Sequence, residues 1–235
     1  MTKNQIIAQQ LEKSFISREK LIKFPVADNG EPLVDLQEIL PLFVLASKPD
    51  VLCNGCKTIF VRQAVAHKLK KIAGRLNKQG LKLKIVDGYR FQKTQQLYWE
   101  QEIKLQKRKR PRLSKREIER LADIFVASPQ TAFHPTGGAV DVTLVNQKTN
   151  RELWLGSRIG DSSVKSYSLY PCLSPLALAN RQILFKEMAR ENFYNLPSEW
   201  WHFSYGAKDW AIFYNKKKAI YDQIKDNKLI RYKFK

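Results

Sequence analysis

The chain has 235 residues, of which 43% are hydrophobic, and this is enough for one globular domain with a sizeable core. Its formal net charge is +20, from 42 basic and 22 acidic residues. No window approaches the roughly 20 apolar residues of a transmembrane helix, and residues 1–20 do not contain the continuous apolar stretch of a signal peptide. We therefore expect a cytoplasmic protein, or a periplasmic one if the native N-terminus differs.

Hydrophobic spacing and turn residues predict a mixture of helices and strands. The N-terminal segment is predicted to be an amphipathic helix through Ile7, Leu11 and Phe15, and residues 24–32 a turn-rich connection. Helices are then expected over residues 59–76, 94–106, 114–125 and 175–192, and strands over 81–86, 137–145 and 200–205. Residues 151–168 are interpreted as an irregular loop and 216–235 as a basic tail with some helical character.

The excess of basic residues predicts attraction to polyanions and is densest over residues 104–116. A solvated helix and loop would have the same composition. The sequence contains no helix-turn-helix, paired zinc motif or RNA-binding aromatic signature. We therefore expect no specific nucleic-acid partner, and at most a weak attraction to anionic polymers or a membrane surface.

The three cysteines are too few and too unevenly placed for a disulfide framework. Cys53 and Cys56 have the spacing of a zinc or redox pair, but a structural zinc site needs four ligands and no second pair follows. We interpret them as ordinary thiols at a turn. His67, on a predicted helix among apolar neighbours, is interpreted as structural.

His134 and Asp141 are the first candidates for metal ligands. His134 opens a turn that contains Gly137 and Gly138, and Asp141 follows on the clearest predicted strand. The flexible diglycine can fold the loop histidine and the strand aspartate toward one metal ion. Imidazole and carboxylate are both suitable zinc ligands.

His202 is the third candidate ligand, because three protein ligands leave one position open for water, as in catalytic zinc sites. Glu199 is the candidate general base. In a straight strand, positions 199 and 202 would point to opposite faces, so a bend after Pro197 and Ser198 is required. Taken alone, these four side chains could also be unrelated surface or core residues.

Five motifs occur in one order: Asp-Gly-Tyr-Arg at 87–90, Val-Ala-Ser at 126–128, His-x-x-Gly-x-Ala-x-Asp at 134–141, Gly-Ser-Arg at 156–158 and Glu-Trp-Trp-His at 199–202. In these motifs, roughly residues 55 to 205 resemble the D-alanyl-D-alanine dipeptidase family, the zinc metallopeptidases related to the vancomycin-resistance dipeptidase. The resemblance implies an α+β fold of the Hedgehog/DD-peptidase type, with a small antiparallel sheet that carries the zinc site and packs against helices.

The resemblance also implies roles for individual residues. His134, Asp141 and His202 match the ligands of one zinc ion per chain, and Glu199 matches the catalytic base. Arg90 matches the arginine that polarises the scissile carbonyl and stabilises the oxyanion, although this tetrapeptide alone would favour a surface ion pair between Arg90 and Asp87.

Three positions depart from the family pattern and concern specificity more than catalysis. Ala132 replaces a serine that lines the substrate pocket, and Phe91 replaces a proline. The segment Ile159-Gly160-Asp161 is altered where the family has an acid that binds the substrate's amino terminus, so either Asp161 serves with a shifted register or no acid serves there.

We expect a single zinc peptidase domain over residues 1–235, with a variable N-terminal helical extension (about 1–50) and a basic C-terminal tail (about 216–235). The expected reaction is zinc-dependent hydrolysis of a short peptide, D-alanyl-D-alanine, in cell-wall turnover. The alternatives are a D,D- or L,D-carboxypeptidase acting on longer peptidoglycan peptides and, from another class, a polyanion-binding protein with a vestigial metal site.

Overall fold

The computed structural model describes residues 2–39, 44–45 and 58–225. A five-stranded sheet lies at its centre, in the order β2 (Val44–Leu45), β4 (Leu81–Asp87), β5 (Ala139–Asn146), β7 (His202–Ser204) and β6 (Tyr194–Asn195). All neighbouring pairs are antiparallel except β2 and β4, which are parallel. A separate two-stranded sheet pairs β1 (Leu33–Asp35) with β3 (Phe60–Arg62). The α+β prediction is confirmed, with one parallel pair that the sequence did not indicate.

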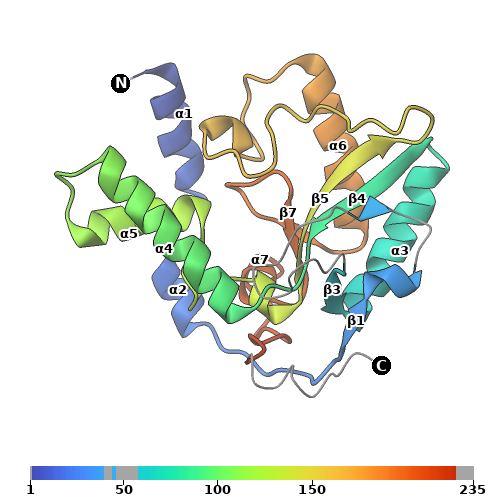
Figure 1. The fold of residues 1–235 in the computed structure, drawn as a ribbon, viewed down its shortest axis with the longest axis horizontal. Helices are drawn as coiled ribbons and strands as arrows, with labels where there is room; N and C mark the ends of the chain where they lie inside the picture. Colours follow the sequence, from blue (N-terminus) through green and yellow to red (C-terminus); the bar gives the residue numbers. More distant parts are fainter. Residues whose placement is uncertain (1, 40–43, 46–57, 226–235) are drawn as a thin grey trace.

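The helices lie on both sides of the central sheet (Figure 1). In chain order they are α1 (Lys3–Glu12), α2 (Arg18–Lys23), α3 (Gln63–Asn77), α4 (Gln92–Lys109), α5 (Lys115–Phe125), α6 (Pro175–Arg190) and α7 (Lys208–Phe213). Short 3-10 turns are η1 (Leu36–Ile39), η2 (His134–Thr136) and η3 (Val164–Ser166). Helices α3 and α6 lie on one side, and the α4–α5 hairpin lies on the other (Figure 1).

The main core is formed between the central sheet and α3. Leu83 pairs with Leu144 and Ile85 with Val142, and all four are fully buried. Leu69, which is also fully buried, belongs to the same apolar cluster. Because side chains alternate along a strand, the residues between these positions, including Asp141, point to the opposite face. The helix-covered face therefore stabilises the sheet and leaves the other face for polar side chains.

A register shift in β4 lies between Ile85 and Asp87. Regular pairing would place Asp87 opposite Val140, on the apolar face. The extra residue, Val86, instead brings Asp87 opposite Asp141. The irregularity therefore carries the carboxylate of Asp87 to the polar face of the sheet.

Most predicted elements are confirmed within a few residues, including the N-cap at Ser114. Its hydroxyl accepts from the Glu117 N–H and the Glu117 carboxylate accepts from the Ser114 N–H, which forms the expected capping box. The basic run 104–116 covers the end of α4, the connecting loop and the start of α5, as the helix-and-loop interpretation expects.

Three expectations about the helices were wrong. The N-terminal helix ends at Glu12 instead of continuing through Phe15, because Ser17 caps a second helix, α2. Residues 60–62 form β3 before α3 begins, since Val61 pairs with Val34. The described part of the basic tail, residues 216–225, contains no helix; Tyr221 within it is buried and donates to Glu31.

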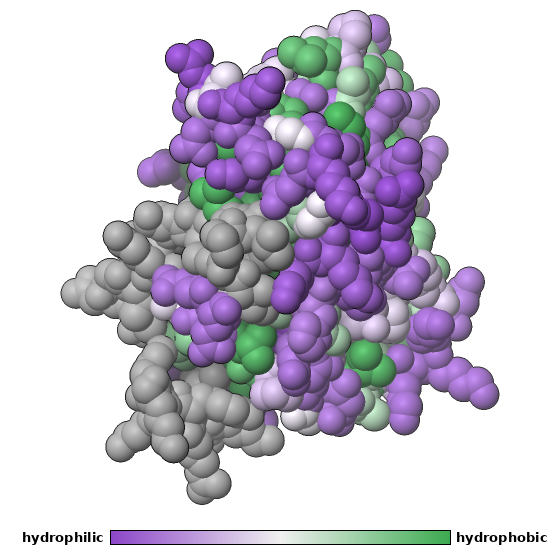
Figure 2. All heavy atoms as spheres, turned by 90° about the vertical axis from the view of Figure 1, so that its right-hand side faces the viewer, coloured by the Kyte–Doolittle hydropathy of each residue, from purple (hydrophilic) through white to green (hydrophobic). Residues whose placement is uncertain are grey.

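The outer face of α3 is solvated. His67, Lys70 and Lys71 are exposed there, and Figure 2 shows this side of the molecule as largely hydrophilic where it is coloured. His67 is thus on the predicted helix but not among core residues. Cys53 and Cys56 lie outside the described residues, and Cys172 is a free, exposed thiol. No helix within the described ranges is long and apolar enough to cross a membrane.

Candidate active site

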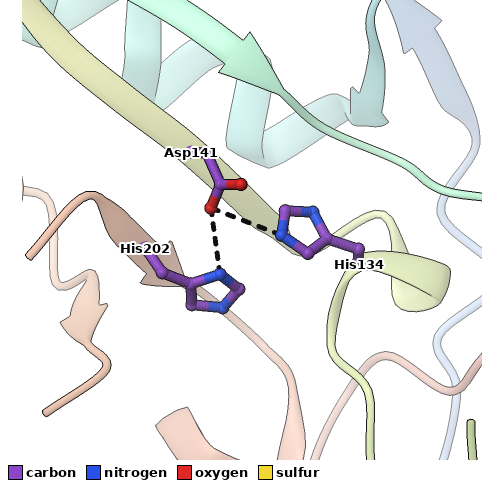
Figure 3. Close-up of side chains that lie close together, drawn as sticks. All are labelled: His134, Asp141 and His202. Carbon is purple, nitrogen blue, oxygen red and sulfur yellow. Dashed lines mark hydrogen bonds and ion pairs between the residues drawn. The ribbon is translucent and has the colours of Figure 1, made fainter. Parts of the chain in front are cut away.

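His134, Asp141 and His202 converge at the polar face of the sheet (Figure 3). Each offers one ligand atom, and these three atoms lie within 4.8 Å of one another. His134 Nε2 is 3.4 Å and His202 Nδ1 is 3.1 Å from the same oxygen, Asp141 Oδ1. All three residues are at most 5% exposed. Two imidazoles and one carboxylate in this arrangement are suitable donors for zinc and leave room for a fourth ligand.

Strand pairing places two of the three side chains. Asp141 of β5 is directly opposite His202 of β7 in the antiparallel ladder. Directly opposed residues point to the same face and lie close together, so backbone register alone brings the carboxylate to the imidazole. This contact joins positions 61 residues apart in the chain.

The turn η2 and its glycines place the third side chain. Gly137 has a φ of 72°, which favours glycine, and a side chain at Gly138 would collide with the carbonyl oxygen of Tyr205. His134 Nδ1 lies 2.7 Å from the Gly88 carbonyl oxygen. Because a carbonyl only accepts, Nδ1 donates a proton to it, and Nε2 is the ring nitrogen that faces the cluster and can bind a metal ion.

The expected bend before His202 is present. The Glu199 N–H donates to the Leu196 carbonyl and the His202 N–H donates to the Glu199 carbonyl, so two consecutive turns precede β7. As a result Glu199 Oε2 lies 3.9 Å from His202 Nδ1, at the edge of the three-residue cluster. The Glu199 side chain is 18% exposed and lines the adjoining cavity.

Arg90 lines the same cavity and is held by two side-chain hydrogen bonds. Its Nη2 donates to Asp87 Oδ2 (2.6 Å) and its Nη1 donates to Gln95 Oε1 (2.7 Å), while its Nε has no partner among the described residues. Arg90 therefore forms the ion pair with Asp87 and also lines the cavity, so the two alternatives for this residue are compatible. Burial lowers the pKa of Arg90, but the nearby carboxylates of Asp87 and Asp141 raise it by more, so the guanidinium stays charged.

The charge of Asp141 is also fixed by its surroundings. Burial raises its pKa, but His134 and His202 lower it by more, and the pKa ends well below the usual range. An ionised carboxylate between two imidazoles is the protonation state that a cation requires.

A cavity of about 280 Å³ opens beside this cluster. Its volume lies just below the lower end of the roughly 300–1,000 Å³ range of ligand pockets in general. Besides Arg90, Glu199 and the three clustered residues, its lining includes Ala132, Ile159, Leu196 and Trp201. Ala132, which departs from the family pattern, is thus at the pocket as expected.

Asp161 is not among the described residues that line this cavity. Its Oδ1 accepts from the Ser163 N–H at 2.7 Å, and its side chain borders a separate surface pocket with Arg158 and Lys165. The structure therefore brings together five of the six candidate residues and leaves Asp161 apart.

Two polar residues of the site were not found from the sequence. Gln95 accepts from Arg90 and donates to the Ala127 carbonyl at 2.7 Å, so it fixes the guanidinium against α4. Asp209 is buried at the cavity wall, where it accepts from the Ser204 hydroxyl. Burial raises the pKa of Asp209 to about 6. The position of Gln95, five residues after Arg90, is the one sequence signal that could have suggested its role. Nothing in the sequence indicated Asp209.

Comparison with known proteins decides the family. The family model described as D-ala-D-ala dipeptidase (Peptidase_M15) matches residues 47–224, well over half of the chain. The chain belongs to this family. It is therefore a zinc metallopeptidase, and its His-Asp-His cluster is compatible with one metal site.

Individual relatives are distant. The D-alanyl-D-alanine dipeptidase of Escherichia coli (strain K12) is 29% identical over 178 residues, which cover 73% of this chain and 83% of the relative. That of Synechocystis sp. is 29% identical over 102 residues, or 39% and 41% of the two chains. Among solved structures, the LdcB LD-carboxypeptidase is similar with a TM-score of 0.46 at 20% identity, covering 81% of this chain and 77% of that one.

Proposed function

We propose that the chain hydrolyses the dipeptide D-alanyl-D-alanine in cell-wall peptide turnover, with one zinc ion held by His134, Asp141 and His202. The observation that carries the proposal is the convergence of these three donors next to Glu199, in a member of the D-ala-D-ala dipeptidase family. Two relatives named D-alanyl-D-alanine dipeptidase support this choice of substrate.

Bound there, zinc would act as a Lewis acid toward the attacking water and the scissile carbonyl. Glu199 takes a proton from that water and delivers it to the leaving amine, as its position at the edge of the ligand cluster allows. Arg90 donates to the carbonyl oxygen as negative charge develops on it. A guanidinium has five N–H donors, and the bonds to Asp87 and Gln95 occupy two of them.

The size of the cavity supports a short substrate. A volume of about 280 Å³ with a mostly apolar lining suits two alanine residues better than an extended peptide. Asp161 stays a weaker candidate for the substrate's amino terminus, because its carboxylate is engaged by its own loop outside this cavity.

Metal analysis combined with a D-Ala-D-Ala cleavage assay tests the proposal. We expect one zinc per chain and hydrolysis that a chelator abolishes and zinc restores. Hydrolysis that persists after the metal is removed would refute the mechanism. Salt-sensitive nucleic-acid binding by a protein without zinc-dependent activity would instead support a polyanion-binding function for the +20 charge.

A D,D-carboxypeptidase is the second candidate, because a larger cavity adjoins the first (about 670 Å³) and could hold the rest of a longer peptide. Parallel assays with free D-Ala-D-Ala and with a pentapeptide that ends in the same dipeptide separate the two functions. Cleavage of the pentapeptide alone would overturn the dipeptidase assignment.

A further inference from the structure

One wall of the active-site cavity comes from outside the part of the chain that matches the family. The cavity that contains His134, Asp141 and His202 is also lined by Phe15, Ile16, Arg18 and Leu21. The family match begins only at residue 47. Phe15 and Ile16 lie between α1 and α2, and Arg18 and Leu21 belong to α2, which lies on the side of the α4–α5 hairpin (Figure 1). The N-terminal segment is thus part of the active site.

Contacts on several sides hold this segment in place. Leu21 is buried in a cluster with Phe133 and Ala207, next to the loop that carries His134. Upstream, the Tyr167 hydroxyl donates to Glu12 Oε1 at 2.7 Å, and the ring of Phe15 packs edge-on against that of Tyr167 at 5.4 Å.

Arg18 ties the segment to α5. Its Nη1 lies 3.4 Å from Asp123 Oδ2 and 4.0 Å from Glu119 Oε2, and its guanidinium lies 5.8 Å from the ring centre of Trp99 on α4. The other oxygen of Asp123 accepts from the Ser128 N–H at 3.1 Å. Both partners of the ion pair are therefore fixed by further contacts.

The same side chains separate two cavities. The active-site cavity of about 280 Å³ and an outer cavity of about 670 Å³ share five lining residues: Phe15, Ile16, Arg18, Asp123 and Ile124. A residue that lines both cavities stands between them. These five residues therefore form a partition between the cavities. The N-terminal segment contributes the apolar side chains of Phe15 and Ile16, and its Arg18 forms an ion pair with Asp123.

We propose that Phe15, Ile16 and Arg18 determine the length of the substrate by closing the active-site cavity at this partition. The inference rests on the proposed function and deepens it. A dipeptide fits within the inner cavity, whereas a longer peptide has to cross the partition toward the outer one. Crossing requires displacing packed apolar side chains and separating Arg18 from Asp123, which disfavours longer substrates in the transition state as well as on binding.

The test compares kcat/KM for D-Ala-D-Ala with kcat/KM for a pentapeptide ending in D-Ala-D-Ala. The variants are Phe15→Ala and Arg18→Met; because both side chains are only partly buried, both proteins should fold. Ile6→Ala, on the exposed side of α1 (46% exposed) and away from both cavities, is the matched control.

Wild type and Ile6→Ala should prefer the dipeptide strongly. Each of the other variants should raise the pentapeptide-to-dipeptide ratio by about tenfold or more, the usual effect of reshaping an apolar pocket. If neither Phe15→Ala nor Arg18→Met changes the pentapeptide-to-dipeptide ratio while zinc-dependent dipeptide hydrolysis is retained, the proposed control of substrate length (the length rule) is overturned. If wild type cleaves neither peptide in a chelator-sensitive way, the proposed function itself fails, and the length rule with it.

Discussion

Asp141 and His202 occupy directly opposed positions of two antiparallel strands, and Asp141 Oδ1 lies 3.1 Å from His202 Nδ1. Asp87 of β4 is in register with Asp141 on its other side. One row across three strands thus carries two of the proposed zinc ligands and the carboxylate that holds Arg90. The sheet therefore sets the spacing between the proposed zinc ligands and Arg90.

Replacing Asp141 by Asn should remove zinc from the protein. The variant keeps the shape of the side chain but loses the only anionic group among the three proposed ligands. We expect zinc affinity to fall by more than the 10–100-fold typical of losing an outer-shell partner, as measured by competition with a chromogenic chelator. Asp222→Asn, at an exposed position, should bind zinc like wild type; an equal loss in both would contradict the assignment.

Glu199→Ala should separate metal binding from turnover. Because Glu199 is proposed as a proton carrier, zinc content should be retained while kcat falls by roughly 10²–10⁴. Metal analysis and steady-state kinetics on the same preparation measure both quantities. Glu100→Ala, on the exposed side of α4, serves as the control. Full activity of the Glu199 variant would refute its role as the base.

Gln95→Leu should impair catalysis through Arg90. The substitution removes the acceptor of the Arg90 Nη1 hydrogen bond and the link to the Ala127 carbonyl, so the guanidinium loses one of its two anchors. Since small misplacements of a catalytic group cost up to about 10²-fold, we expect kcat to fall by about 10- to 100-fold with zinc content unchanged. Gln96→Leu is a matched control, because the neighbouring Gln96 is exposed and bonds only to Glu100 among the hydrogen bonds of the described chain. Equal kinetics for the two variants would contradict a positioning role for Gln95.

Glu187→Gln should destabilise the protein in a pH-dependent way. Burial raises the pKa of Glu187, but hydrogen bonds from Arg75 and Gln79 lower it by more, so the folded-state pKa is below the ordinary value. Its contribution to the free energy of unfolding is therefore complete above the ordinary glutamate pKa of about 4.3 and is lost as pH falls through the lowered folded-state pKa. We expect Glu187→Gln to lose about 1–3 kcal/mol at neutral pH.

Chemical denaturation at several pH values measures this loss. The difference between wild type and Glu187→Gln should shrink below about pH 4.3. The exposed pair of Glu19 and Lys23 provides the control, and Glu19→Gln should change stability by less than about 1 kcal/mol at any pH. A Glu187 effect that is constant from pH 7 to pH 3 would contradict the assigned ionisation.

The parts of the site that local sequence encodes were predictable. Three such features act over a few residues: the glycines after His134, the alternation of side chains around Asp141 and the turn between Glu199 and His202. The order of the motifs related these features to one family. Gln95 lies within the predicted helix, but no local pattern indicates that its amide contacts both Arg90 and the Ala127 carbonyl.

Long-range packing was not predictable. Arg18 meets Asp123 across 105 positions, and the pattern of Ile7, Leu11 and Phe15 favoured one continuous helix that would have carried Phe15 elsewhere. Ser17, the N-cap of α2, is a short-range signal that the sequence contains. The cavity that Phe15 and Ile16 line is formed only when distant segments pack together in the folded chain. Likewise, no property of residues 216–225 alone indicates that Tyr221 is buried.

The partition beside the active site has a consequence for how such enzymes diverge. His134, Asp141 and His202 lie on the central strands and their flanking turns, whereas Phe15, Ile16 and Arg18 lie outside the central sheet, between α1 and α2 and at the start of α2. Substitutions at Phe15, Ile16 and Arg18 would alter the boundary of the cavity, while the strand register of Asp141 and His202 does not depend on these residues. Under the proposed length rule, peptide length can therefore be selected independently of the hydrolytic chemistry.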